Sequence, residues 1–247
     1  MRLILDGSRP ATSNMAIDEM LMKSAPCLRV YAWDKPSISI GYFQNVEETA
    51  KRFRCEQKNI PVVRRLTGGG LVFHQNDLTF SLVVAENSFL PRNVKDSYLK
   101  VTEALRIGLK DSYPGLDYAP CNDTSVRESQ KERICFEKPS CYDLLWKGKK
   151  VMGASQRRLN GGILHQSTVF LEEGAKTLAE KIIRGFEQSW KISFEEKPLT
   201  DSELREAEKI EAERYASSSW AFGASRLLSS RNTQGSYKAA SPTSGRN

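Results

Sequence analysis

The sequence has little of what metal sites, disulfide frameworks and membrane segments require. Its only histidines are His74 and His165, and neither has the spacing of metal ligands. Five cysteines occur, but none forms a CxxC pair, which makes a disulfide framework or a zinc site a poor interpretation. No apolar run approaches the ~20 residues of a membrane helix, and the N-terminal residues do not resemble a secretory signal. We therefore expect a cytoplasmic protein with reduced cysteines, no metal and no membrane contact.

The chain is basic, but its excess charge is concentrated near the C-terminus. The net charge is +7, and residues 216–247 contain four basic and no acidic residues, which leaves +3 for residues 1–215. A mildly basic globular part suits an acidic protein or a phosphate as well as it suits RNA, and we expect no nucleic-acid partner. We predict one catalytic domain over residues 1–215 and a low-complexity, flexible tail over residues 216–247, in which Trp220 and Phe222 are candidates for local docking.

Hydrophobic periodicity predicts strands in the middle of the chain and helices around them. Strands are predicted at residues 3–5, 28–33, 37–40, 62–65, 78–84, 142–146, 150–155 and 163–171. Helices are predicted from a cap at Thr12 or Ser13 to about Ser24, and at residues 45–59, 94–113, 176–186 and 201–215. A hairpin turn is expected at residues 147–148. This order is typical of an α+β fold rather than of a regular βαβ alternation.

The most distinctive segment is RRLTGGGLVFH at residues 64–74. Three consecutive glycines after a predicted strand let the backbone turn tightly and approach a ligand without an intervening Cβ atom. Exposed backbone N–H groups beside Arg65 would suit an acyl carbonyl or a phosphate. The segment lacks the GK[ST] ending of a P-loop and the GxGxxG spacing of a dinucleotide site. A glycine-rich turn with two surface arginines is the alternative interpretation.

Two further segments offer reactive side chains. In KKVMGASQ, at residues 149–156, Lys150 precedes an alternating strand and can reach an acyl carbonyl or an adenylate phosphate. The alternative is a solvated surface lysine. In ICFEKPS, at residues 134–140, Cys135 becomes a nucleophile if a neighbouring cation lowers its pKa. The alternative is a buried structural cysteine.

Together these segments resemble the biotin/lipoate protein ligase and octanoyltransferase superfamily, over roughly residues 1–190. NMAIDE at residues 14–19 is similar to the first-helix motif of that superfamily. Residues 64–74 resemble its RRxTGGGxVFH acyl-binding loop, and residues 150–156 resemble its KVxGSAQ lysine strand. The resemblance implies the biotin/lipoate ligase catalytic-domain fold, which is an α+β domain with a mixed, mostly antiparallel central sheet flanked by helices.

The segment CFEKPSCYDL at residues 135–144 indicates the branch of the superfamily. It is similar to the CFxxPSxYEL segment of octanoyltransferases whose catalytic cysteine lies upstream of the lysine. Lipoate ligases generally have an Asn-Asp pair where this chain has Tyr142 and Asp143, and the GRGRxGR-like loop of biotin ligases is missing. No cysteine follows Cys141, which excludes the branch with a downstream cysteine. The chain departs from the family pattern in the order Ala154-Ser155 and in the additional thiol of Cys141.

The resemblance implies an octanoyltransferase of lipoate biosynthesis that moves an octanoyl or lipoyl-type group from a thioester to a lysine of a lipoyl carrier domain. The donor would be octanoyl acyl carrier protein or an octanoylated lipoyl domain. The acceptor would be glycine cleavage H protein or the E2 subunit of a 2-oxoacid dehydrogenase. Cys135 would carry the acyl group as a thioester and Lys150 would assist it, without a cofactor. Substrate contacts are implied for Arg65, Thr67, Gly68, Gly69, Gly70, His74, Gly153, Ala154, Gln156 and His165.

Two other functions remain open from the sequence. An ATP-dependent lipoate–protein ligase would use ATP and Mg²⁺ to form an acyl-adenylate. Many such ligases carry an additional C-terminal domain, for which the ordered part of this chain is too short. An inactive, carrier-binding module would keep the fold without turnover. The presence of Arg65, Lys150 and Cys135 argues against that third function.

Overall fold

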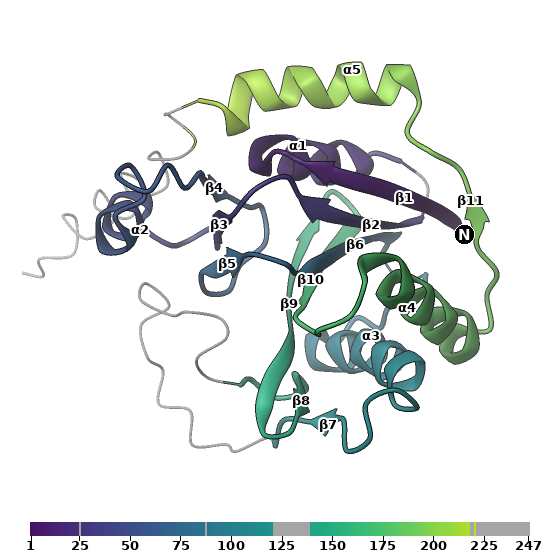
Figure 1. Ribbon diagram of the computed structural model, residues 1–247. Helices are drawn as coiled ribbons and strands as arrows, with labels where there is room; N and C mark the ends of the chain where they lie inside the picture. The colour runs from purple at the N-terminus through teal and green to yellow at the C-terminus, as the bar shows by residue number, and fades with distance from the viewer. Residues whose placement is uncertain (25, 87, 121–138, 218–219, 221–247) are drawn as a thin grey trace, which may run out of the picture.

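An eight-stranded mixed sheet forms the centre of the computed structural model, which describes residues 1–24, 26–86, 88–120, 139–217 and 220 (Figure 1). The strand order is β11-β1-β2-β6-β10-β9-β8-β7, in which only the pairs β11–β1 and β1–β2 are parallel. The predicted α+β fold with a mixed, mostly antiparallel sheet is therefore confirmed. The strands are β1 (Arg2–Arg9), β2 (Cys27–Trp33), β6 (Leu78–Ala85), β7 (Asp117–Tyr118), β8 (Leu144–Trp146), β9 (Lys149–Leu159), β10 (Gly162–Val169) and β11 (Glu195–Glu196).

A second, three-stranded sheet lies beside the first, in the order β4-β3-β5 (Figure 1). Asn45 caps the helix that packs against this sheet by accepting hydrogen bonds from the N–H groups of Glu47 and Glu48. The helix is shorter than the predicted 45–59, because Arg54 takes the left-handed conformation at φ 51° and ends it. The elements of this part are β3 (Ser37–Ile40), α2 (Val46–Phe53), β4 (Val62–Arg64) and β5 (Val72–His74).

Helices cover both faces of the large sheet, and their bounds are α1 (Ala11–Leu21), α3 (Val94–Leu109), α4 (Ala175–Trp190), α5 (Asp201–Ile210) and a π-helical turn (Glu211–Tyr215). Helix α1 lies on one face and is covered in turn by α5, whereas α3 and α4 lie on the other face (Figure 1). Side chains alternate across a strand, so Phe80 and Leu82 of β6 belong to the core beneath α3 and α4, whereas Val83 belongs to the core beneath α1.

The start of α1 differs from the prediction that Thr12 or Ser13 caps it. Pro10 occupies the cap position, and no side chain caps the helix. The hydroxyl groups of Thr12 and Ser13 instead donate hydrogen bonds to the carboxylate of Glu211, at 2.5 and 2.7 Å. The two hydroxyl groups that were predicted to cap the helix thus bind a carboxylate that lies far along the chain.

Trp220 packs on the domain, although it lies in the segment expected to be a tail. Its Nε1 donates a hydrogen bond to the backbone O of Arg64 at 3.1 Å, and its ring lies edge-on to those of Tyr42 and Tyr215. Trp220 therefore docks locally. Phe222 lies outside the described residues, and the domain boundary at residue 215 stays a prediction.

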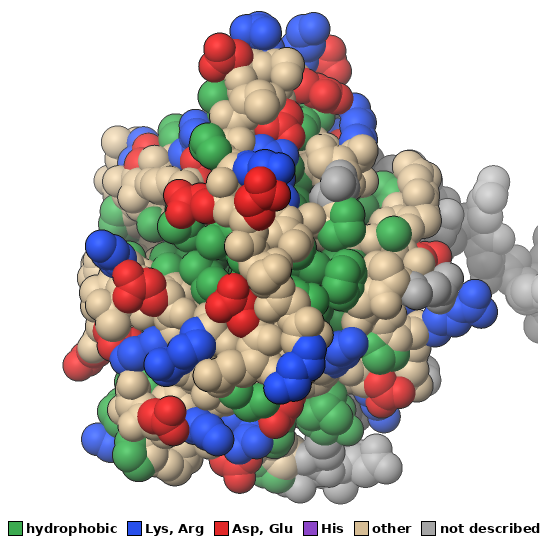
Figure 2. Space-filling model, turned by 90° about the vertical axis from the view of Figure 1, so that its right-hand side faces the viewer, with side chains coloured by type: hydrophobic (Ala, Val, Ile, Leu, Met, Phe, Trp, Pro, Cys, Tyr) green, Lys and Arg blue, Asp and Glu red, His purple; other side chains and the backbone are tan. Residues whose placement is uncertain are grey.

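The described surface mixes charges of both signs. On the face that carries α4 and β11, acidic and basic side chains are interspersed (Figure 2). Ion pairs such as Arg2 with Glu203 and Lys23 with Glu206 use part of this charge. Within the described part of the chain, no helix is both long enough and apolar enough to span a membrane.

Two glycines let α3 and α4 pack closely against each other. A Cβ atom on Gly108 would lie 2.1 Å from the backbone O of Lys181, and a Cβ atom on Gly185 would lie 2.1 Å from the backbone O of Ala104. Both distances are far below van der Waals contact, so only glycine fits at either position. Because these helices cover the largest core cluster, their separation affects the whole domain.

We expect Gly185→Ala to destabilise the domain, although alanine is ordinarily the better helix former by about 1 kcal/mol. The added methyl group has to push the two helices apart, and overpacking of this kind costs about 1–3 kcal/mol. Urea unfolding followed by circular dichroism measures the change. Gly174→Ala, at the start of α4, is the control, because a Cβ atom there meets nothing within 4 Å. Equal stability of the two variants would contradict the close packing.

Candidate active site

The glycine-rich segment forms a loop between β4 and β5, called the glycine loop below (residues 66–71). Arg65 holds this loop from within. Its Nη2 donates hydrogen bonds to the backbone O atoms of Gly68 and Gly70 at 2.7 Å each, and its Nη1 donates to the backbone O of Ser39 at 3.1 Å. Arg64 and Arg65 are only 1% and 5% exposed. The alternative of a turn with two surface arginines is therefore wrong.

A glycine outside the motif allows the glycine loop to close. A Cβ atom on Gly41, directly after β3, would lie 2.0 Å from the backbone O of Gly69. Tyr42 donates its backbone N–H to the backbone O of Thr67 at 2.9 Å, which fixes the same contact. A Cβ atom on Gly68, by contrast, would meet no atom within 4 Å. Sequence reasoning missed Gly41 because its partner lies in a different strand connection.

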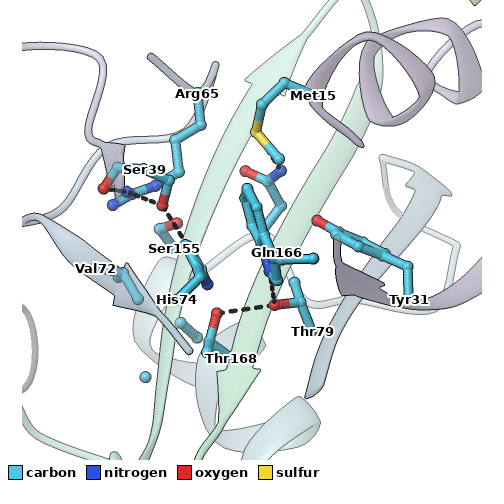
Figure 3. A pocket seen from close by; sticks show the side chains of 13 residues that line it. Met15, Tyr31, Ser39, Arg65, Val72, His74, Thr79, Ser155, Gln166 and Thr168 are labelled. Carbon is cyan, nitrogen blue, oxygen red and sulfur yellow. Dashed lines mark hydrogen bonds between the residues drawn. The ribbon is translucent and has the colours of Figure 1, made fainter. Parts of the chain in front are cut away.

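A narrow cavity lies between the glycine-loop region, α1 and the large sheet (Figure 3). It has about 340 Å³ of empty space, including its opening to solvent. Four of the predicted substrate contacts line it, namely Arg65, His74, Gly153 and Ala154. Figure 3 shows Arg65 and His74 on one side of the cavity and Met15 and Tyr31 on the other. The glycine loop and the lysine strand, far apart in sequence, are thus brought together around one space.

One row of cross-strand neighbours forms much of the cavity floor. Gly153 of β9 pairs with Thr168 of β10, Thr168 pairs with Thr79 of β6, and Thr79 pairs with Tyr31 of β2. Cross-strand neighbours occupy the same face of a sheet. The floor therefore runs straight across four strands, and a glycine lies at its β9 end.

A chain of hydrogen bonds connects this floor with the glycine loop and with α1. Ser155 Oγ donates to Thr67 Oγ1 at 2.8 Å, Thr67 Oγ1 donates to Gln166 Oε1 at 2.7 Å, and Gln166 Nε2 donates to Asp18 Oδ2 at 2.7 Å. Thr67, a predicted substrate contact, is fully buried. It joins the glycine loop to the sheet. Because these polar atoms bond one another, the surface that they leave to the cavity is mainly carbon.

Asp18 is the centre of a buried ion-pair network beneath α1. Arg29 is fully buried, and its guanidinium donates to Asp18 Oδ1 and to Asp6 Oδ2 at 2.7 Å each. Tyr31 Oη and Ser81 Oγ also donate to Asp18, at 2.9 and 2.7 Å. The sequence identified the first-helix motif, but it did not indicate that Asp18 binds two side chains that line the cavity, those of Tyr31 and Gln166. The pairing with Arg29 has no signal in the sequence except the presence of a charge within an apolar strand.

Lys150 is buried and fixed by an ion pair. Its side chain is 3% exposed, and its Nζ lies 2.7 Å from Oδ2 of Asp143. The same oxygen accepts a hydrogen bond from the backbone N–H of Ser140 at 2.6 Å. Burial raises the pKa of the Asp143 carboxyl, an effect that Lys150 opposes. The alternative of a solvated surface lysine is therefore wrong.

A β-bulge directs Lys150 to the cavity face of the sheet. The predicted hairpin of β8 and β9 is present, but its register shifts: Leu144 pairs with Met152, whereas Leu145 pairs with Lys150. Leu144 and Met152 belong to the core beneath α3 and α4. Adjacent residues of a strand point to opposite faces, so Leu145 and its partner Lys150 lie on the other face, which is also that of the cavity floor.

His74 is held at both ring nitrogens. Its Nδ1 lies 2.8 Å from Asp77 Oδ2, and its Nε2 lies 2.8 Å from Ser39 Oγ. The ring stacks on that of Trp33, with the centroids 3.7 Å apart. Burial lowers the pKa of His74 below its ordinary value, although Asp77 opposes the shift. A neutral ring fits these partners: Nδ1–H donates to the carboxylate, and Nε2 accepts from the serine hydroxyl.

Two predicted substrate contacts, Gln156 and His165, lie on the opposite face of the sheet. Ser97 of α3 donates a hydrogen bond to Gln156 Oε1 at 2.8 Å, and the ring of His165 packs against that of Tyr98. Burial lowers the pKa of His165 to about 3, so the ring is neutral. These two side chains do not line the cavity. Successive side chains of a strand point to opposite faces of the sheet, so the cavity face is occupied by the sequence neighbours of Gln156 and His165.

The predicted nucleophile, Cys135, lies outside the described residues. Cys27 and Cys55 are free but buried, and burial raises the pKa of both thiols, that of Cys27 to about 12. The thiolate is the nucleophilic form of cysteine. Cys27 and Cys55 are therefore unsuited to nucleophilic catalysis, which is consistent with their omission from the predicted site.

We expect Gly41→Ala to displace the glycine loop and to lower the stability of the domain by about 1–3 kcal/mol. The physical reason is the overlap of the new methyl group with the backbone O of Gly69. Differential scanning fluorimetry measures the change in melting temperature. Gly68→Ala is the matched control within the GGG motif, and we expect it to melt close to wild type. A greater loss for Gly68→Ala than for Gly41→Ala would show that the loop is placed incorrectly.

Comparison with known proteins gives relatives in both sequence and structure. Octanoyltransferase LipM of Halalkalibacterium halodurans is 29% identical over 90% of this chain and 98% of its own length. Octanoyltransferase LipM of Carboxydothermus hydrogenoformans is 37% identical over 69% of this chain and 65% of its own length. Protein Ta0514 of T. acidophilum, solved with bound lipoic acid, superposes with a TM-score of 0.73 at 25% identity, covering 90% of this chain and 98% of its own.

The family itself is identified by a match over most of the chain. The family model described as the lipoyl protein ligase A/B catalytic domain matches residues 10–201. That range contains the first-helix motif, the glycine loop and the lysine strand, which are the segments that surround the cavity. The resemblance drawn from those motifs is confirmed, and the chain belongs to the lipoyl protein ligase A/B catalytic domain family.

Proposed function

We propose that this chain is an octanoyltransferase of lipoate biosynthesis that carries the octanoyl group on Cys135. The observation that carries the proposal is the position of Lys150. It is a buried lysine, fixed by Asp143, on the same sheet face as a cavity whose surface is mainly carbon. Relatives that are octanoyltransferases over most of the chain support octanoyl as the group transferred. Cys135 lies five positions before Ser140 in the sequence. The backbone N–H of Ser140 donates a hydrogen bond to the carboxylate of Asp143.

The proposed reaction has two transfers. The Cys135 thiolate attacks the carbonyl carbon of the donor thioester. The donor C–S bond breaks, and the donor leaves as a thiolate that takes up a proton. The amine of the acceptor lysine then attacks the acyl-enzyme. A C–N bond forms, the C–S bond to Cys135 breaks, and the proton of the amine is released. Since a thioester is converted into an amide, no ATP is needed.

Lys150 has two roles in this proposal. A fixed ammonium group favours the thiolate form of a neighbouring cysteine. It also stabilises the negative charge that develops on the carbonyl oxygen during each attack. Asp143 positions the ammonium group through the 2.7 Å contact. The backbone of Gly153, at the β9 end of the cavity floor, leaves room for the acyl chain next to this lysine.

The proposed partners follow from the two transfers. The donor is octanoyl acyl carrier protein, which holds the octanoyl group as a thioester. The other donor implied by the resemblance, an octanoylated lipoyl domain, holds the group as a lysine amide, so the attack of Cys135 would break a C–N bond and release the lysine amine instead of a thiolate. The acceptor is a lipoyl domain, such as glycine cleavage H protein or the E2 subunit of a 2-oxoacid dehydrogenase. The reaction takes place in the cytoplasm. Arg65 and the glycine loop form the roof of the acyl site in this proposal, and Thr67 ties that roof to the sheet.

We expect the enzyme to form octanoyl-lipoyl domain from octanoyl acyl carrier protein without ATP, through a covalent intermediate. Cys135→Ala removes the nucleophile, so both the intermediate and the product should be lost. Intact mass spectrometry of the enzyme and of the lipoyl domain, under reducing conditions, measures both. Cys141→Ala is the control and should keep most of the activity. Turnover that requires ATP and survives Cys135→Ala would instead identify an ATP-dependent lipoate–protein ligase.

We expect Lys150→Ala to slow acylation of Cys135 by about 100-fold or more, since one charge-stabilising donor is lost from the transition state. The substitution also leaves Asp143 buried without its partner, which costs about 3 kcal/mol of stability. The double variant Lys150→Ala/Asp143→Ala removes that unpaired charge, so it should regain stability without regaining rate. Single-turnover acylation and urea unfolding give the two quantities separately.

Lys149→Ala is the control for the register of this strand. Lys149 is exposed and neighbours Lys150, so we expect its removal to leave both rate and stability close to wild type. A double variant at positions 150 and 143 that acylates at the wild-type rate would show that Lys150 has a structural role only. Greater sensitivity at Lys149 than at Lys150 would show that the strand register is wrong.

A further inference from the structure

A segment that follows the family match covers the outer surface of α1. The match to the family model ends at residue 201, which is also the first residue of α5. Helix α5 and the π-helical turn after it lie along α1, which separates them from the large sheet (Figure 1). Together with Trp220 they are called the C-terminal segment below. None of the motifs that resemble the family lies in this segment.

The C-terminal segment is bound to both ends of α1. Glu211 accepts hydrogen bonds from two hydroxyl groups in the first turn of the helix. Near the last turn, Glu19 forms an ion pair with Arg214 and accepts a hydrogen bond from Tyr215 Oη at 2.8 Å. Tyr215 is only 5% exposed. The segment therefore follows α1 as a fixed part of the domain.

Beyond α1, the C-terminal segment binds the strand that leads into the glycine loop. Trp220 Nε1 donates to the backbone O of Arg64 at 3.1 Å, and Arg64 Nε donates to the backbone O of Trp220 at 3.3 Å. Arg64 Nη1 also donates to the backbone O atoms of Tyr42 and Gln44, at 2.6 and 2.7 Å. The indole ring lies edge-on to the ring of Tyr42, with the centroids 5.8 Å apart. Trp220 thus fixes the end of β4 and the turn after β3 together.

Both partners of Trp220 support the glycine loop. Arg64 directly precedes Arg65, whose guanidinium binds backbone O atoms of the loop. Tyr42 donates its backbone N–H to the backbone O of Thr67, which belongs to the loop. A displacement of Arg64 or Tyr42 is therefore transmitted to the roof of the acyl site.

The cavity lies between the two structures that the C-terminal segment joins. Met15 of α1 lies on one side of it and Arg65 on the other (Figure 3). Inside the domain, these sides are connected by the hydrogen bonds from Thr67 through Gln166 to Asp18. On the outside, the C-terminal segment connects them a second time, through its ion pair with α1 and its reciprocal hydrogen bonds with β4. The separation of the two sides therefore depends on both connections.

We propose that the C-terminal segment is a clamp that sets the width of the acyl site, and that Trp220 is a positioning residue for the transfer. This inference rests on the proposed octanoyl transfer. Trp220 acts through Arg64 and Tyr42, and not through contact with the substrate. The cavity offers the acyl chain a surface that is mainly carbon. A gap of about 0.5–1 Å already forfeits about a quarter to a half of the van der Waals attraction, so a wider cavity binds the chain more weakly.

The clamp is separate from the groups that carry out the reaction. Lys150 is fixed by Asp143, a contact to which the C-terminal segment contributes nothing. Loss of the clamp therefore weakens binding of the octanoyl chain in the ground state and in the transition state alike. A change of that kind raises the donor concentration needed for half-saturation and leaves the limiting rate unchanged.

The test compares Trp220→Ala and Trp220→Phe with wild type in single-turnover acylation by octanoyl acyl carrier protein. Trp220→Ala removes the ring and its donor, so we expect the half-saturating donor concentration to rise by about tenfold. Trp220→Phe keeps a ring against Tyr42 and loses only the donor, so we expect a rise of about threefold. The limiting rate should stay close to wild type in both variants. Partial unfolding lowers only the amplitude, which separates a positioning role from a loss of folded enzyme.

Trp190→Ala is the matched control. Trp190 is also half-buried, and its Nε1 also donates to a backbone O, that of Lys100 at 3.3 Å. Its ring packs against the core beneath α3 and α4, so this variant should keep the wild-type half-saturating concentration. Hydrogen exchange of residues 64–71, followed by mass spectrometry, gives a second readout that needs no substrate. Exchange there should be faster in Trp220→Ala than in Trp190→Ala.

An unchanged half-saturating concentration in both Trp220 variants would overturn the clamp and leave the proposed function intact. An equal rise in Trp190→Ala would overturn it as well. Absence of acylation in the wild type would overturn the proposed function itself, and the clamp would then be overturned only by equal exchange of residues 64–71 in the Trp220→Ala and Trp190→Ala variants. If Trp220→Ala does not fold, Trp220→Phe decides both readouts.

Discussion

Arg29 places a positive charge in the interior of the domain. Much of the site consists of the acidic side chains that neutralise this charge and of the side chains that bind them. The guanidinium of Arg29 is fully buried between Asp6 of β1 and Asp18 of α1. A buried charge without a partner is strongly destabilising, so strand and helix have to meet at this point. Asp18 has further acceptor capacity, which Tyr31 and Gln166 use. The ion pair thereby fixes side chains that belong to the cavity.

The glycine loop is connected to this network through the side chain of Gln166. Gln166 receives a hydrogen bond from Thr67, and Thr67 receives one from Ser155. The loop is thus tied to the large sheet from below, while Arg65 binds its backbone from within. Close contact with Gly41 completes the arrangement. A loop with three consecutive glycines would otherwise be flexible, and these contacts explain how it can form the rigid roof of an acyl site.

Local patterns in the sequence predicted the fold class and most of the helices and strands, and the family resemblance implied that the glycine loop and the lysine strand belong to one site. The motifs sufficed because each has its own composition and order. Long-range geometry was not accessible. The bulge that turns Lys150 to the cavity face appears only in the pairing register, and Gln156 and His165 were assigned to the site without knowledge of the face that they occupy. Gly41 carries no local signal, because its role depends on a partner in another element.

The central claim is that an octanoyl group bound to Cys135 lies between the glycine loop and the floor formed by Gly153, Thr168 and Thr79. A crystal structure of the octanoyl-enzyme, trapped in the absence of an acceptor, tests this claim most directly. Electron density for a thioester is expected at Cys135, with the carbonyl oxygen near Lys150 Nζ and the acyl chain along the cavity floor. An acyl chain outside this cavity, or an acyl group on a residue other than Cys135, would contradict the claim.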